Sequence, residues 1–446
     1  MLLQQAKWHH EVLGTNRGAH SFSLVRGEIE MALCERVGVV LQPTKGSWDA
    51  KGVAAPIVWC EDEVYFMLYQ GWEKGSGLFG DGSPRMLGLA MSEDGIHWEK
   101  HPDNPVLVPT EGSFDELGFE VGSLLTVGDE YWLYYSGFGA DKKLRIGLAT
   151  SKDKKEWHKL DSNPVVDVGG KECWDENGVA FPSVIKMKHD FLMLYGGYGE
   201  RSMQIGGAIS GDGRNWAKFE ENPVFMQRGW HEDTQCLFWD AGIEAHHAFI
   251  HGDHIVMLYE GIGRQGRYGI GIAYSPDGIA WARSPRNPIV GLTQTVVKQD
   301  MSVVHPWLVK GKGLLYYSEV MGASADATHR ICLARIDEEK LEPSEEKALV
   351  YSLWQRRLVE TNGAVTSAVY TLAFAQKTVW LRSSTDGVVT VEVDVAGDDS
   401  WHELCEMEVK ANVLWHSHIV DQITRLRLRF QPRGSAFVSA WLAMSK

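Results

Sequence analysis

The sequence predicts an all-β protein: a five-bladed β-propeller with a C-terminal β-sandwich. The first observation is a Ser-x-Asp turn followed by a tryptophan, which occurs four times at spacings of 59, 59 and 65 residues. The second is an Asn-Pro turn that follows every copy. The tryptophans are Trp98, Trp157, Trp216 and Trp281, and the turns begin at Asn104, Asn163, Asn222 and Asn287. A period of this length, built from short strands and turns, is typical of propeller blades around a central axis.

The composition indicates a globular, strand-rich protein. Of the 446 residues, 44% are hydrophobic and 11% are aromatic, which is not the composition of a disordered chain. The formal net charge of −15 makes nucleic acid and anionic membrane surfaces unfavourable partners. No run of 18 apolar residues occurs, so we expect no membrane-spanning segment. A neutral ligand is more compatible with this negative charge than nucleic acid or an anionic membrane is.

The N-terminus and the cysteines bear on the compartment. Residues 1–14 lack the continuous apolar run of a signal peptide. The six cysteines are scattered without CxxC spacing, which signals neither a disulfide framework nor a zinc site. We therefore expect a cytoplasmic protein that uses no metal and no other cofactor.

The repeat divides residues 28–337 into five units, preceded by an N-terminal segment of residues 1–27. Each unit has a buried inner strand and a second strand that ends in a tyrosine. The inner strands begin at Gly52, Gly118, Gly178, Gly242 and Ser302, and the tyrosines are Tyr69, Tyr135, Tyr195, Tyr259 and Tyr317. The fifth unit lacks an outer strand, whereas residues 37–49 resemble residues 105–115. We therefore expect the N-terminal strand to close the ring, which leaves no open edge.

Beyond the repeat, residues 338–346 form a charged linker and residues 347–446 a predicted β-sandwich domain. Residues 387–395 and 424–430 alternate apolar and polar side chains at period two, the pattern of half-buried antiparallel strands. The role of this domain is open between packing support, glycan binding and contact between copies in a homo-oligomer.

The turns and the aromatic-Asp openings of the units resemble the five-bladed propeller glycosidase superfamily. This superfamily includes the invertase, levansucrase and arabinanase/xylosidase families and the mannoside phosphorylases. The resemblance covers about residues 28–337 and implies three acidic residues at the mouths of inner strands, or one acid with a basic phosphate pocket in the phosphorylases. This sequence departs from the pattern in the first blade, where Ala55 precedes Pro56 in place of an aspartate.

Two glutamates are the candidate catalytic residues. The position two before Pro56 is apolar in three units, but it is Glu120 in the second unit and Glu244 in the fourth. A carboxylate on a buried strand is costly unless it is paired or faces a polar cavity. We predict an acid/base pair across the central funnel, with inversion favoured if the carboxyls lie about 6.5–9.5 Å apart. The alternative is structural pairing with arginine, and which glutamate is the acid stays open.

Eight further residues are candidate substrate-binding groups. They are His246, His305, Glu260, Glu319, Trp72, Arg85, Arg264 and Arg267. The histidines and glutamates interrupt apolar columns at strand ends and can bind sugar hydroxyls. Trp72 and Arg85 lie in a glycine-rich loop that could cover the pocket. The arginines could hold phosphate or a carboxylated sugar, or merely neutralise the glutamates. The histidines could equally be structural.

One aspartate recurs in every unit and is predicted to cap a turn. The residues are Asp49, Asp115, Asp175, Asp240 and Asp300. A residue needed once for chemistry should not occur five times, whereas a turn-capping carboxylate should.

These observations predict a glycoside hydrolase that acts on a small oligosaccharide or glycoside. An intracellular glycoside phosphorylase is the second interpretation, with phosphate held by the arginines or histidines. A noncatalytic glycan-binding propeller is the third. In each case the partner is a small carbohydrate, whose sugar, anomer and linkage the sequence leaves open.

Overall fold

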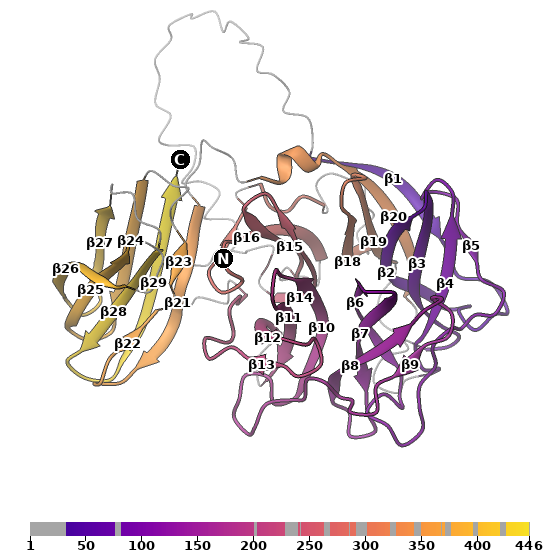
Figure 1. Ribbon diagram of the computed structural model, residues 1–446, viewed down its shortest axis with the longest axis horizontal. Helices are drawn as coiled ribbons and strands as arrows, with labels where there is room; N and C mark the ends of the chain where they lie inside the picture. The colour runs from indigo at the N-terminus through magenta and orange to yellow at the C-terminus, as the bar shows by residue number, and fades with distance from the viewer. Residues whose placement is uncertain are drawn as a thin grey trace, which may run out of the picture. The chain divides into compact units, whose positions relative to one another are not determined.

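The computed structural model shows an all-β chain, as predicted (Figure 1). It describes residues 33–75, 82–199, 203–227, 240, 242–262, 268–284, 286–290, 301–321, 327–342, 349–366, 368–370, 376–395, 400–419 and 425–445. The described elements are strands, apart from the short 3-10 helix η3 (Glu338–Leu341). Within these residues there is no helix of a length and hydrophobicity that would span a bilayer. The predicted N-terminal segment, residues 1–27, lies outside the described part.

The first part of the chain forms five antiparallel units of four strands, and the strands of the first four units follow chain order. The first unit contains β2 (Gly52–Glu61), β3 (Val64–Trp72), β4 (Met86–Ser92) and β5 (Glu99–Lys100). The second contains β6 (Phe119–Val127), β7 (Glu130–Phe138), β8 (Leu144–Ser151) and β9 (His158–Lys159). The third contains β10 (Gly178–Lys186), β11 (Phe191–Tyr198), β12 (Gln204–Ser210) and β13 (Ala217–Lys218). The fourth contains β14 (Gly242–His251), β15 (His254–Ile262), β16 (Tyr268–Ser275) and β17 (Trp281–Arg283).

The fifth unit combines strands from distant parts of the sequence. It contains β18 (Met301–Val309), β19 (Leu314–Met321), β20 (Thr328–Ile336) and β1 (Cys34–Leu41). β1 pairs antiparallel with β20, and Cys34 lies opposite Ile336 (Figure 1). β1 therefore takes the outer place that the sequence of the fifth unit leaves empty.

The recurring aspartate binds the same partners in successive units. In the second unit Asp115 is fully buried, and its carboxylate accepts hydrogen bonds from the Tyr135 hydroxyl at 3.0 Å and the Lys159 ammonium at 2.6 Å. Asp49, Asp175 and Asp240 each bind the tyrosine and the basic residue of their own unit in the same way. These contacts support the structural role predicted for the aspartates, while Asp300 lies outside the described residues.

Each inner strand carries an irregularity near its middle, at the level where the units approach one another. The pairing of the inner strand with its neighbour shifts between Ala54 and Ile57, Glu120 and Ser123, Ala180 and Ser183, Ile243 and His246, and Val304 and Trp307. A bulge bends a strand and re-aims the side chains beside it. Glu120 and Glu244, the two glutamates predicted to be catalytic, both lie at such bulges. Their side chains can therefore point away from the hydrophobic core.

The C-terminal part contains two antiparallel sheets. One continues the sheet of the fourth unit, because β17 pairs with β21 (Leu349–Val359), and its order goes on with β29 (Ala436–Ser445), β24 (Gln376–Ser383) and β27 (Leu414–Ile419). In the other, β28 (Arg425–Pro432), β25 (Gly387–Asp394) and β26 (His402–Val409) are joined by β22 (Ala364–Val365) and β23 (Val369–Tyr370), which pair with β28. Buried residues of both sheets belong to one hydrophobic cluster. The β-sandwich, the linker of residues 338–346 and the domain boundaries stay predictions.

We expect Gly122→Ala to destabilise the fold. A Cβ atom at Gly122 on β6 would lie 1.7 Å from the Tyr134 carbonyl oxygen, and this backbone atom cannot move without disrupting the unit. Overpacking of this kind costs about 3 kcal/mol. The urea midpoint, followed by tryptophan fluorescence, should fall. Gly170→Ala is the matched control because nothing lies within 4 Å of its added Cβ. Equal midpoints for the two variants would contradict this account of the packing.

Candidate active site

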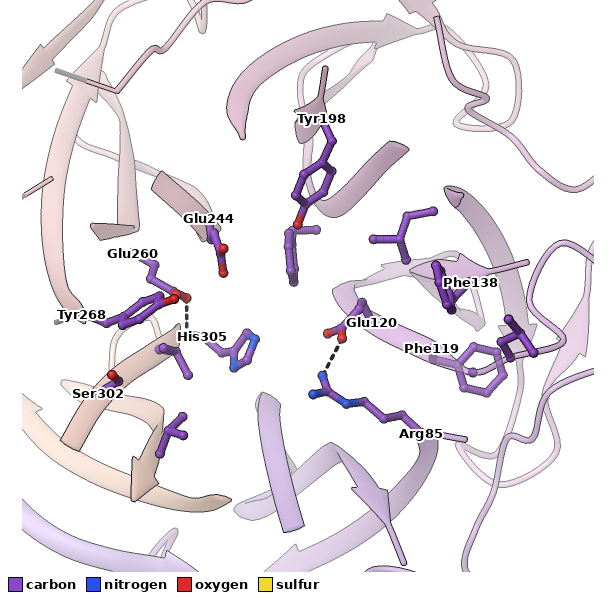
Figure 2. A pocket seen from close by; sticks show the side chains of 16 residues that line it. Arg85, Phe119, Glu120, Phe138, Tyr198, Glu244, Glu260, Tyr268, Ser302 and His305 are labelled. Atoms are coloured by element: carbon purple, nitrogen blue, oxygen red, sulfur yellow. Dashed lines mark hydrogen bonds and ion pairs between the residues drawn. The ribbon is translucent and has the colours of Figure 1, made fainter. Parts of the chain in front are cut away.

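A cavity of about 280 Å³ gathers side chains from all five units. Its polar lining includes Arg85, Glu120, Glu244, Glu260 and His305, which converge on one space (Figure 2). The aromatic lining consists of Phe119, Phe138, Phe181, Tyr198 and Tyr268. Carboxyl groups beside aromatic rings are suited to a sugar, which offers hydroxyl groups and apolar C–H faces.

Glu120 on β6 is held by a buried ion pair. The Arg85 guanidinium donates to Glu120 Oε1 at 2.5 Å, and both side chains are less than one-tenth exposed. Gln70 on β3 donates from Nε2 to Glu120 Oε2 at 3.3 Å and to the Phe119 carbonyl at 2.8 Å. Breaking a buried pair by removing one partner typically costs about 3–5 kcal/mol. Glu120 is therefore a fixed negative charge on the cavity wall.

Trp72 supports this pair from behind. Its ring centroid lies 4.7 Å from the Arg85 guanidinium carbon, and its indole N–H donates to the Gly75 carbonyl at 3.1 Å. The side chain is fully buried and does not line the cavity. The structure thus places Trp72 under Arg85, whereas the sequence predicted a substrate-binding residue in a loop that covers the pocket.

Glu244 on β14 points into the cavity and has no hydrogen-bond or ion-pair partner for its carboxyl group among the described residues (Figure 2). Burial, and secondly the negative charge of Glu120, raise the pKa of Glu244 to about 7. Because a general acid works best when its pKa lies near the working pH, Glu244 is suited to give a proton near neutrality.

Glu260 on β15 forms the wall beside Glu244. Its Oε2 accepts a hydrogen bond from the His305 backbone N–H at 3.3 Å. Burial first, and the charge of Glu244 second, raise the pKa of Glu260 well above its ordinary value. This environment favours a neutral carboxylic acid.

Tyr198 and Tyr268 also line the cavity, and neither was predicted from the sequence as a site residue. The Tyr198 hydroxyl points into the cavity, and the Tyr268 hydroxyl lies beside the Glu260 carboxyl group (Figure 2). Burial and then the neighbouring carboxylates raise the pKa of both phenols, which therefore stay protonated. The sequence did carry a signal for Tyr198: it stands three residues after Tyr195, in the position that Trp72 and Phe138 occupy in their own units.

The remaining predicted residues divide between this cavity and other places. His305 lines it, and burial together with Arg85 and His329 lowers the pKa of its imidazole to about 3, so the ring is neutral. His246 instead lines a second, smaller cavity with Trp307.

Glu319 lies away from the cavity, held by Arg36 at 2.8 Å and by Arg330 at 2.7 Å. The sequence interpretation missed this because both arginines become its neighbours only through the pairing of β1, β19 and β20. Arg264 and Arg267 lie outside the described residues.

Comparisons with known proteins support the fold. A family model described as "Glycosyl hydrolases family 32 N-terminal domain" matches residues 56–173. A solved structure described as a glycoside hydrolase has a TM-score of 0.53 at 19% identity and covers 68% of this chain and 92% of that one. At this identity the likeness to the solved structure is one of fold. The resemblance to the five-bladed propeller glycosidases and phosphorylases is thereby confirmed.

Curated relatives match part of this chain. An uncharacterized protein of Mycobacterium tuberculosis is 30% identical over 164 residues, or 36% of this chain and 52% of that relative. A 1,2-beta-oligomannan phosphorylase of Thermoanaerobacter is 26% identical over 189 residues, or 42% of this chain and 58% of that enzyme. The chain spans about half the length of the curated relatives it matches.

We expect the stability of the propeller to depend on pH through Glu244. Ionising Glu244 is harder in the folded protein than in the unfolded chain, so the wild type loses stability as pH rises from 4.5 to about 7, by up to about 3 kcal/mol. Glu244→Gln cannot ionise and should gain stability relative to the wild type over this range, then stay level. Urea denaturation at a series of pH values measures the difference. The exposed Glu111→Gln is the control, and a gap between Glu244→Gln and wild type that is constant with pH would contradict the assignment.

Proposed function

We propose that this propeller is an enzyme that cleaves small glycosides, with Glu244 as the general acid. The supporting observation is that Glu244 points into the cavity with no partner among the described residues, and that burial and Glu120 raise its pKa to about 7. A protonated Glu244 can give its proton to the oxygen of the departing group as the glycosidic bond breaks. Such an acid beside an ionised carboxylate is the pair on which glycoside cleavage depends.

Glu120 supplies the second carboxylate in this proposal. The ion pair with Arg85 fixes its position and occupies one of its oxygens. A carboxylate oxygen has two acceptor sites, so Glu120 can still accept a hydrogen bond from a water molecule or stabilise positive charge developing on the sugar. Without Arg85, two negative charges would oppose each other in one buried space.

The substrate in this proposal is small. The cavity of about 280 Å³ lies near the lower end of the range of about 300–1000 Å³ for ligand pockets. Phe138 and Tyr198 line it and offer apolar ring faces to a sugar. A small carbohydrate as the partner, action in the cytoplasm and a homo-oligomer formed through the C-terminal domain all remain proposals.

Transfer to water is the first candidate reaction, and transfer to phosphate is the second. The similarity to a 1,2-beta-oligomannan phosphorylase favours phosphate. The described cavity lining favours water, because its cationic side chain is Arg85, which is already bound to Glu120.

The role of Glu244 is tested by comparing two classes of substrate. We expect Glu244→Gln to lower kcat/KM by about 100-fold or more on alkyl glycosides and manno-oligosaccharides, whose leaving oxygen needs a proton. The loss should be much smaller on dinitrophenyl glycosides, whose leaving group departs as an anion. Glu120→Gln should lose activity on both classes. Glu111→Gln is the control, since its side chain is exposed. Equal losses of Glu244→Gln on both classes would reject Glu244 as the acid.

Phosphate dependence separates the two reactions. We expect the wild type to release free sugar from 1,2-beta-linked mannobiose or another glycoside at the same rate with and without inorganic phosphate. Chromatography of the products, combined with a phosphate assay, measures this. A sugar phosphate that forms only when phosphate is added would replace hydrolysis by phosphorolysis. Tight binding without turnover across the panel would indicate a glycan-binding propeller.

A further inference from the structure

The residue after the recurring tyrosine of each second strand lies at the junction with the next unit, and in four units its side chain forms a hydrogen bond across that junction. These residues are Gln70, Ser136, Gly196, Glu260 and Ser318. The Ser136 hydroxyl accepts a hydrogen bond from the backbone N–H of Phe181 at 2.8 Å. The Ser318 hydroxyl accepts one from the N–H of Ala55, also at 2.8 Å. Serine therefore satisfies the backbone at two of the five junctions.

Glu260 makes the equivalent bond at the fourth junction, from the His305 N–H to Oε2 at 3.3 Å. The three acceptor residues bind matching positions, because Ala55, Phe181 and His305 all precede the proline of an inner strand and all have positive φ. A serine would meet this structural need without placing a carboxyl group in a site that is 1% exposed. The glutamate adds a second oxygen, Oε1, at the wall of the cavity (Figure 2).

The groups around Glu260 favour its neutral form. Glu244 and the Tyr268 hydroxyl are the nearest ionisable groups in the cavity, with Glu120 farther across it (Figure 2). The Arg85 cation is bound to Glu120, and the His305 ring is neutral. A second negative charge beside Glu244 would therefore have no compensating cation among the described lining residues, and burial penalises it further.

We propose that Glu260 remains a protonated acid and donates a hydrogen bond from its cavity-facing oxygen to an oxygen of the bound sugar. Glu260 is then a substrate-binding residue that selects a ligand with an acceptor at that position. The inference rests on the proposed glycoside cleavage, and it goes beyond it by naming the state and the role of a third carboxyl group.

The protonation state is tested without any substrate. Infrared spectra of the full-length protein at pH 8 should show a carboxylic-acid C=O band in the wild type and in Glu244→Gln. The band should be absent from Glu260→Gln and Glu260→Ser. A band of equal intensity in all four proteins, or no band in the wild type, overturns the assignment. This result is independent of whether any glycoside is cleaved.

The binding role is tested with the variant that the repeat itself suggests. Glu260→Ser keeps the acceptor for the His305 N–H, as Ser136 and Ser318 do at their junctions, but withdraws the donor from the cavity. We expect it to fold with a thermal midpoint near that of the wild type and to lower kcat/KM about 10-fold. Glu260→Gln keeps a neutral donor and should lose less. A series of substrates each lacking one hydroxyl should contain one member that loses about 10-fold with the wild type but nothing further with Glu260→Ser.

The outcomes separate the alternatives. Unchanged kcat/KM in Glu260→Ser means that the residue is only structural, and an equal or larger loss in Glu260→Gln means that it acts as an ionised carboxylate; either result overturns the proposal. If the wild type cleaves no glycoside, the proposed function is wrong. The infrared result and the affinities of the same sugars, measured by calorimetry, then still decide whether Glu260 is a protonated donor.

Discussion

Three carboxyl groups share one buried cavity whose described lining offers one cation, and this imbalance determines the character of the site. Glu120 is ion-paired with Arg85. Glu244, which has no such partner among the described residues, experiences burial and the charge of Glu120, so its pKa rises to about 7. Glu260 is more deeply buried and lies beside Glu244, so its pKa is also raised well above its ordinary value. Position alone thus distinguishes an ion-paired carboxylate from two carboxyl groups whose pKa is raised, which is how one cavity can hold an acid and a carboxylate together.

The internal repeat explains how such a site is built. The backbone of every unit is held by the same contacts, as between Asp115, Tyr135 and Lys159 in the second unit. Because those contacts lie away from the cavity, the side chains at the inner bulges are free to differ between units. The carboxyl groups that line the cavity are therefore departures from the repeat. Glu260 in place of a serine, and Glu120 and Glu244 in place of an alanine or valine, are such departures.

The ring also brings distant segments into contact. Side chains at similar positions in the sequence therefore have different surroundings in the structure. Glu260 on β15 and Glu319 on β19 both lie near the end of the second strand of a unit, one residue apart in alignment. The pleat of a strand sends adjacent side chains to opposite faces. Glu260 thus faces the cavity, whereas Glu319 faces Arg36 and Arg330 at the junction that β1 completes. Glu260 therefore lines the cavity, and Glu319 takes part in ion pairs away from it.

The sequence by itself determined the all-β class, the five units and the column that contains Glu120 and Glu244, because turn residues and strand periodicity are local and recur at a fixed spacing. Only the tertiary structure decided that Arg85 is bound to Glu120, that Trp72 lies beneath Arg85, and that Tyr198 and Tyr268 complete the cavity. These relations join residues of different strands and different units. They depend on the bulges, on side-chain direction and on ring closure, none of which a local pattern specifies.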